Sequence, residues 1–340
     1  MLYELGAIPE TVHWGFFNKD LQPMLHVRSG DIVTVKTVTH HAGDAPDLML
    51  DDGVRELFAS VPMARRGPGK HILVGPIFVE EAWPGDTLVV EYMDMVLRSR
   101  YGSNVAAHWG CLHADLGPEE RVTVFELDTM RETASPLFSY RYPGKYAEPG
   151  RVVPPEETVR LLPSVRLCVP LRPHIGCAGV APKGEGSVSS VPPGDHGGNV
   201  DNWRMGAGSR MHYPVFHRGA LFSLGDPHAA QGDGEVSGTA VESPLDVTMR
   251  LTVRRGGGFP FPVLETPAEW MVHGFGATLD AAMRQAAGRA VRFLCDRTGL
   301  HERESYSLVS AAVDFGVTQA VDQTLGVHAR VPKSLLMIGL

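Results

Sequence analysis

Runs of alternating apolar and polar residues recur along this 340-residue chain, with turn-forming residues between them. The clearest runs are 31–38, 86–97, 122–127, 164–171 and 246–253. A period of two sends successive side chains to opposite faces of a strand, and the 38 glycines and 26 prolines favour short strands joined by turns. The pattern predicts a mostly β (α+β) fold with a β-rich sandwich or barrel-like core.

The exception to the strand pattern comes near the C-terminus. Thr278 is a suitable N-cap, Gly299 a suitable stop, and a second short helix is expected at about 303–313. Apolar residues recur at helical spacing between the two caps, at Leu279, Met283, Ala286, Ala290, Phe293 and Leu294. We expect these C-terminal helices to pack against the β-rich core rather than to carry chemistry.

One proline-rich stretch, residues 142–163, is the best candidate for an internal boundary, because proline interrupts both sheet and helix pairing. The same stretch is also compatible with a long surface loop. We expect a single domain over residues 1–340, with 142–163 as its candidate boundary.

Charge and composition exclude several classes of function. The net charge of −8 and the absence of long Lys/Arg clusters argue against a nucleic-acid partner. No window holds the roughly 20 apolar residues of a membrane helix, and the first residues lack a signal pattern. The four cysteines form no CxxC pair, so we expect buried, reduced thiols. Together these features predict a cytoplasmic protein without a membrane partner.

Candidate chemical groups are concentrated in residues 174–242, where histidines and acids stand among glycines. The most informative are Asp195-His196, Asp226, His228 and Glu235. Glycine lets the chain turn sharply, so that distant polar side chains can converge. Imidazoles and carboxylates are the ligands of a catalytic Zn²⁺-type site, which leaves one position for water. A structural network of ion pairs and turns is the alternative.

Four blocks of the sequence resemble the acetamidase/formamidase family. They are GPIFVEEAWPGDTLVVE at 75–91, PGDHGGNVD at 193–201, LFSLGDPHAAQGDGEVSGTAVE at 221–242 and VTQAVDQTLGVHARVPKSLL at 317–336. The resemblance implies a β-rich fold and hydrolysis of formamide or another short aliphatic amide. It also implies a divalent metal and a homo-oligomer, a dimer or higher.

Residue chemistry suggests a role for each candidate. We assign His196, Asp226 and His228 to the metal, which we expect to be Zn²⁺, with Ca²⁺ as the alternative. Glu235 is either a fourth ligand or the general base, and Glu80 is a second candidate base. Asp195 and Asp201 would orient the ligand histidines. Such an ion lowers the pKa of water and polarises a carbonyl, as amide hydrolysis requires.

One segment departs from the family pattern. An Asp-Cys-Phe-Gly-Gly-Gln-like block is expected after the first strand, but residues 38–44 read VTHHAGD. His40 or His41 is therefore an alternative ligand or proton carrier. Because adjacent strand residues point in opposite directions, we expect only one of the two to face the site.

Other functions remain as alternatives. A non-catalytic β-rich metal or sugar-binding protein would share the Gly/Asp loops, and the same scaffold could cleave a different C–N or ester bond. A Ser-Ser-Lys or Cys-Glu-Lys site and an α/β-hydrolase are disfavoured, because the nucleophile segments are lacking and GxSxG is absent. Trp83, Trp109, Trp203 and Trp270 are candidate pocket residues, although aromatic residues in β-rich proteins more often pack in cores.

Overall fold

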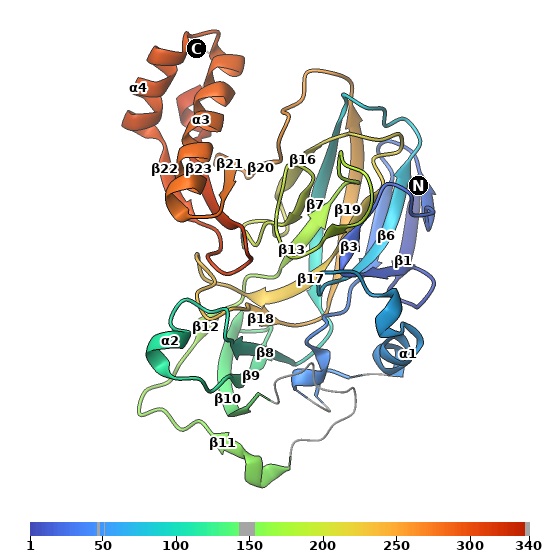
Figure 1. Cartoon of the computed structure of the whole chain (residues 1–340), viewed down its shortest axis with the longest axis vertical. Helices are drawn as coiled ribbons and strands as arrows, with labels where there is room; N and C mark the ends of the chain where they lie inside the picture. The colour runs from blue at the N-terminus through green and yellow to red at the C-terminus, as the bar shows by residue number, and fades with distance from the viewer. Residues whose placement is uncertain (46–47, 51, 143–153, 337–340) are drawn as a thin grey trace.

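The computed structural model describes residues 1–45, 48–50, 52–142 and 154–336 (Figure 1). Much of the expected boundary at 142–163 therefore lies outside the described residues. None of the helices in the described ranges is both long and apolar enough to cross a membrane.

Two large sheets dominate the described residues, which confirms the mostly β fold. The first sheet has the order β1 (Leu2–Gly6), β5 (Ile32–Lys36), β19 (Leu245–Arg254), β7 (Thr87–Leu97), β16 (Arg210–Pro214), β20 (Val263–Glu265), β21 (Glu269–Gly276), β23 (Leu325–Pro332) and β22 (Asp314–Val317). Most neighbours are antiparallel, and β1 pairs in parallel with β5.

The second sheet has the order β11 (Thr158–Arg160), β10 (Thr133–Arg141), β9 (Arg121–Asp128), β8 (Tyr101–Ala106), β18 (Val241–Glu242), β17 (Phe222–Ala230), β13 (His174–Gly179) and β15 (Gly197–Asn199). Other strands join it from the side: β12 (Val169–Pro170) pairs with β10, and β6 (Ile72–Val79) pairs with β17, β2 (Val12–Trp14) and β4 (Leu25–Val27). A separate pair joins β3 (Phe16–Phe17) to β14 (Val188–Ser189).

The main hydrophobic core contains side chains from both sheets. Val33, Val90 and Leu251 come from the first sheet, and Val74 and Leu224 come from the second. All five are fully buried, and burying a Val or Leu side chain is worth about 1.5–3 kcal/mol. The two sheets thus pack face to face, as the alternating runs predicted.

Four of the five predicted alternating runs coincide with strands β5, β7, β9 and β19. The run at 164–171 was wrong for most of its length, since only Val169–Pro170 pairs as a strand. Pro163 precedes it, and its apolar Val165 and Leu167 are exposed rather than facing a core. Alternation without a covering layer did not produce a strand here.

Helix α3 (Leu279–Thr298) has the predicted caps: Thr278 accepts from the backbone N–H of Ala281, and Gly299 follows in a left-handed conformation. Helix α4 (Glu302–Ala312) follows it, and both lie beyond β21–β23 at one end of the molecule (Figure 1).

The buried face of α3 differs from the prediction at Leu279 and Met283, which are exposed. Ala282 is fully buried in their place, next to the predicted Ala286 and Ala290, which are buried as expected. The reason is close packing, because an added Cβ on Gly274 of β21 would lie 2.2 Å from the backbone nitrogen of Ala286. Only small side chains fit between this helix and this strand.

Shorter helical segments occupy the connections. They are η1 (Ala42–Asp44), α1 (Asp52–Ser60), η2 (Met63–Arg65), α2 (His113–Leu116), η3 (Pro155–Glu157) and η4 (Lys333–Leu336). Helix α1 was not predicted by the sequence patterns. It buries Val54 and Leu57 against a small cluster that includes Trp14 and Ile72.

Candidate active site

Asp226 and His228 lie two residues apart on β17, so their side chains share one face of the sheet. Along this strand the partner changes from β6, whose pairing ends at Gly225, to β18, whose pairing begins at His228. Asp226 stands at this junction with a φ of 58°, a left-handed conformation that is uncommon outside glycine but tolerated by Asp. The backbone thus departs from regular strand geometry where the carboxylate enters the site.

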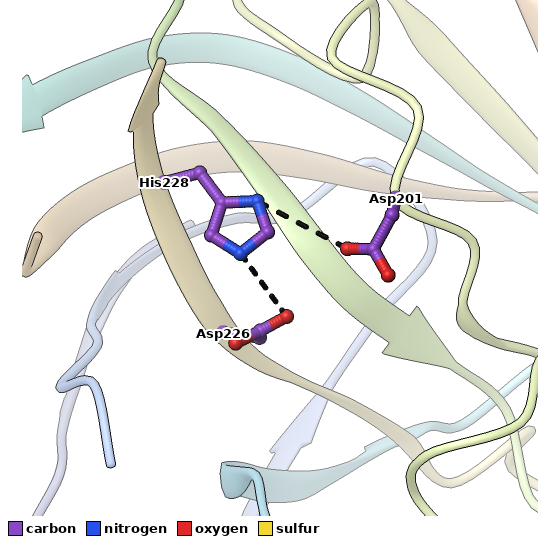
Figure 2. Close-up of side chains that lie close together, drawn as sticks. All are labelled: Asp201, Asp226 and His228. Carbon is purple, nitrogen blue, oxygen red and sulfur yellow. Dashed lines mark ion pairs between the residues drawn. The ribbon is translucent and has the colours of Figure 1, made fainter. Parts of the chain in front are cut away.

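His228 lies between several carboxylates. Its Nε2 is 3.2 Å from Asp226 Oδ2 and 3.3 Å from Glu242 Oε1. Figure 2 shows the ring between Asp226 and Asp201, whose Oδ1 is 4.0 Å from Nδ1. Asp201 follows β15, so three separate strand regions contribute to one cluster.

His174 on the neighbouring strand β13 contacts the ring of His228. Its Nε2 lies 3.0 Å from Nδ1 of His228 and 2.8 Å from Oε1 of Gln231. Nδ1 of His174 donates to the carbonyl oxygen of Arg172 at 2.6 Å, and burial lowers the pKa of His174 to about 3. These contacts hold the ring of His228 with its Nε2 toward Asp226 and Glu242.

This Nε2 is buried and has no hydrogen-bond partner among the described residues, as is also true of Asp201 Oδ1. Burial lowers the pKa of His228, but Glu242 and Asp226 outweigh it and raise the pKa well above its ordinary value. A proton and a metal ion would therefore compete for the same nitrogen.

A second group of acids adjoins the first. Asp201, Glu235 and Asp322 bring their oxygens within 4.8 Å of one another, and so do the ligand atoms of His228, Glu235 and Glu242. Burial raises the pKa of Glu235 and Asp322 well above the usual range, and it raises that of Asp201 to about 6. Buried acids in contact are costly unless positive charge balances them, so these groups could hold a metal ion.

The acid–histidine cluster forms one end of a cavity of about 390 Å³. His40, His41 and His71 line it too. The expectation that only one of His40 and His41 faces the site was wrong. They lie in the turn before η1, where strand alternation does not apply, and their ring centroids are 4.0 Å apart.

His71 links this wall to the cluster. Its Nε2 lies 3.7 Å from Asp226 Oδ2, and its Nδ1 is 2.9 Å from the hydroxyl of Ser190. Although burial raises the pKa of Asp226, the charges of His71 and His228 outweigh it and hold that pKa below its usual value. The pKa of Asp226 is thus lowered, whereas those of Asp201, Glu235 and Asp322 are raised.

Comparisons with known proteins identify relatives of this chain. Residues 183–336, which include Asp201, Asp226, His228, Glu235, Glu242 and Asp322, match the profile of the Acetamidase/Formamidase family. The crystal structure of an acetamidase from Bacillus halodurans is similar over 98% of this chain and 100% of that chain, with a TM-score of 0.77 and 28% identity. Residues 183–336 thus resemble the acetamidase/formamidase family, and the chain shares its fold with a solved acetamidase.

Curated relatives in the acetamidase/formamidase family match over a shorter length. The acetamidase of Mycolicibacterium smegmatis is 28% identical over 235 residues, 58% of this chain and 57% of that protein. The formamidase of Methylophilus methylotrophus is 31% identical over 196 residues, 49% of this chain and 47% of that protein. The chain thus spans about half the length of the curated relatives it matches.

Three candidates from the family-like blocks lie apart from the acid–histidine cluster and are absent from the lining of the cavity. The ring of His196 packs edge-on against Phe17, with centroids 5.0 Å apart. Asp195 forms an ion pair with Arg289 of α3. Glu80 is partly exposed and pairs with His26 at 2.9 Å.

Sequence reasoning assigned no role to Glu242, Asp322 or His71. Glu242 lies in the acid–histidine cluster because it is paired with His228 in the register of β17 and β18. Asp322 stood in the family-like block at 317–336, which marked the segment but not the residue. His71 precedes β6 in a stretch without a histidine or acid pattern, so no sequence signal distinguished it.

Proposed function

We propose that this protein hydrolyses a primary amide to a carboxylate and ammonia, in a metal-dependent reaction at the acid–histidine cluster. The match of residues 183–336 to the Acetamidase/Formamidase family supports this reaction class. The observation that carries the proposal is the buried Nε2 of His228, which faces Asp226 and Glu242 without a hydrogen-bond partner among the described residues. A cation between these groups would satisfy the nitrogen and balance the acids.

Asp226, His228 and Asp201 are the proposed metal ligands, with Glu242 beside them. This set keeps Asp226 and His228 from the sequence prediction, moves Asp201 from an orienting role to a ligand, and leaves out His196. An imidazole together with carboxylates suits Zn²⁺, whereas an oxygen-only set such as Asp201, Glu235 and Asp322 suits Ca²⁺. We therefore keep Zn²⁺ as the first choice.

A divalent ion supplies Lewis acidity, which polarises a carbonyl and lowers the pKa of water to about 7. Glu235 is the proposed proton carrier. It lies within reach of the His228 and Glu242 ligand atoms, where a carboxylate can accept a proton from water and return it to the departing nitrogen.

Asn199 is the proposed contact for the substrate amide. It lines the cavity, is almost completely buried, and its Oδ1 has no partner among the described residues. An amide oxygen accepts hydrogen bonds, so it can orient the N–H groups of a primary amide. His174 has a proposed positioning role, because its contact with Nδ1 of His228 holds that ring against the acids.

An amide panel tests this function. Purified protein is assayed for ammonia and carboxylate with formamide, acetamide, propionamide and phenylacetamide, and its bound metal is quantified. Equal amounts of the two products, formed in a metal-containing protein, support the proposal. Bound metal without turnover of any amide would favour a non-catalytic binder, and turnover of esters alone would favour a different hydrolase. Homo-oligomerisation stays a prediction that sedimentation would check.

A further inference from the structure

We infer that the part of the cavity lined by Trp109 is an acyl subsite for an aryl-sized group, so that the preferred substrate is a primary amide with an aromatic acyl chain. The inference rests on the proposed function, because it names the substrate class of that same site. The inference depends on Trp109, which lines the cavity.

The size of the cavity is the first argument. Acetamide has as many heavy atoms as four water molecules, which occupy about 120 Å³ in the liquid. The cavity measures about 390 Å³, which is in the range of pockets for larger ligands. An ion and acetamide would leave much of it to solvent, so the site has room for a longer acyl group.

The cavity also has an aromatic wall. Of the tryptophans named from the sequence, Trp109 lines this cavity, together with Tyr142 and Val191. Trp109 is 37% exposed, so its ring has surface that a ligand can cover. Aromatic side chains stack on aryl groups and gain about 0.5–1.5 kcal/mol beyond the area they bury.

The Trp109 ring is held in place before any ligand arrives. Its Nε1 donates to the carbonyl oxygen of Gly238 at 2.7 Å. A Cβ on Gly238 would lie 2.8 Å from that nitrogen, so only glycine permits this approach. His108 packs edge-on against the ring, with centroids 4.8 Å apart, and Glu120 holds His108 at 2.9 Å. A preorganised wall loses little entropy on binding.

The same loop is tied to the segment that carries Glu235. The backbone N–H groups of Ala107 and Cys111 donate to the carbonyls of Ser237 and Val236, at 2.9 and 2.8 Å. Gly238 N in turn donates to the carbonyl of Glu235 at 3.0 Å. The aromatic wall and the proposed proton carrier are therefore fixed relative to each other, as selection of an acyl group at the reacting end requires.

Two measurements on the full-length protein test the inference. Ammonia release gives kcat/KM for phenylacetamide and acetamide, and ligand-observed NMR on chelator-treated protein gives the dissociation constants of the same two amides. We expect wild-type protein to favour phenylacetamide about tenfold in both. Trp109→Ala should remove most of that preference, chiefly through KM, and Trp109→Phe should retain part of it. Trp83→Ala, at an exposed tryptophan outside the cavity lining, should leave the preference unchanged.

The outcomes separate the two proposals. If amides are hydrolysed but phenylacetamide binds no more tightly than acetamide, the aryl subsite is wrong and the proposed function stands. An equal loss of the preference for phenylacetamide in Trp109→Ala and Trp83→Ala would also overturn the subsite. If no amide is hydrolysed but the binding preference is present and depends on Trp109, the subsite stands and the proposed function falls. If no amide is hydrolysed and phenylacetamide binds no better than acetamide, the aryl subsite and the proposed function are both wrong.

Discussion

Gly176 on β13 lies directly against the carboxylate of Asp226, so close that an added Cβ would come within 2.5 Å of Asp226 Oδ2. The same Cβ would lie 2.4 Å from Asp201 Oδ1 and 2.5 Å from Cε1 of His228. A residue without a side chain at this position is therefore a condition for the three proposed ligands to meet.

Gly176→Ala should abolish stoichiometric metal binding and lower amide turnover by about 100-fold or more, since a displacement of about 1 Å can cost that much. The added methyl group occupies space that the ligands need. Metal content and kcat/KM are the measurements, with circular dichroism to verify folding. Gly184→Ala, where an added Cβ meets no atom within 4 Å, is the matched control and should resemble wild type. Normal metal content in Gly176→Ala would contradict the geometry.

His174→Phe should weaken metal binding by about 10–100-fold, because the ring nitrogen that holds His228 Nδ1 in place at 3.0 Å is lost. The measurement is competition with a chromophoric chelator. His26→Phe, which alters an exposed histidine paired with Glu80, is its control. An unchanged metal affinity in His174→Phe would show that His174 does not direct the ligand nitrogen.

Glu235→Gln should lower kcat by about 100- to 10,000-fold while the metal stays bound, because the amide cannot carry a proton. Steady-state kinetics and metal analysis on one preparation check this. Glu80→Gln changes a partly exposed acid outside the cavity lining and should leave kcat within about twofold. The opposite result, a large loss in Glu80→Gln alone, would restore Glu80 as the base.

His41 and Asp44 predict a dependence of stability on pH. Burial alone lowers the pKa of His41, but the Asp44 carboxylate, 2.6 Å from Nδ1, outweighs burial and raises the pKa to about 9. Because the folded-state pKa lies above the unfolded value of 6.5, the pair stabilises fully below pH 6.5. This contribution is lost as the pH rises through about 9.

In urea unfolding with chelator present, the wild-type free energy of unfolding should fall by about 2–3 kcal/mol more than that of His41→Asn as the pH rises from about 6.5 to 9.5. His41→Asn lacks the titrating group, so its free energy of unfolding should change less over the same pH range. Parallel slopes for the two proteins would mean that His41 does not gain a proton on folding.

Much of the fold followed from sequence because strands such as β5, β7 and β19 each bury one face, which imposes a period of two. Asp226 and His228 were predicted as ligands from their residue types in a glycine-rich stretch, whereas the structure places them on strand β17, where residues two apart share a face. Glu242 and Asp322 were beyond this reasoning, because strand register and loop position depend on contacts between distant segments. His40 and His41 were misjudged because a turn, not a strand, carries them.

Titration of chelator-stripped protein with Zn²⁺, following bound metal and ammonia release in the same samples, tests the central claim most directly. The account predicts no ammonia release from the stripped protein, then release that rises in proportion to bound metal up to saturation. The His228→Ala protein should recover neither bound metal nor ammonia release. Full activity in the stripped protein, or equal recovery in His228→Ala, would contradict metal-dependent hydrolysis at this cluster.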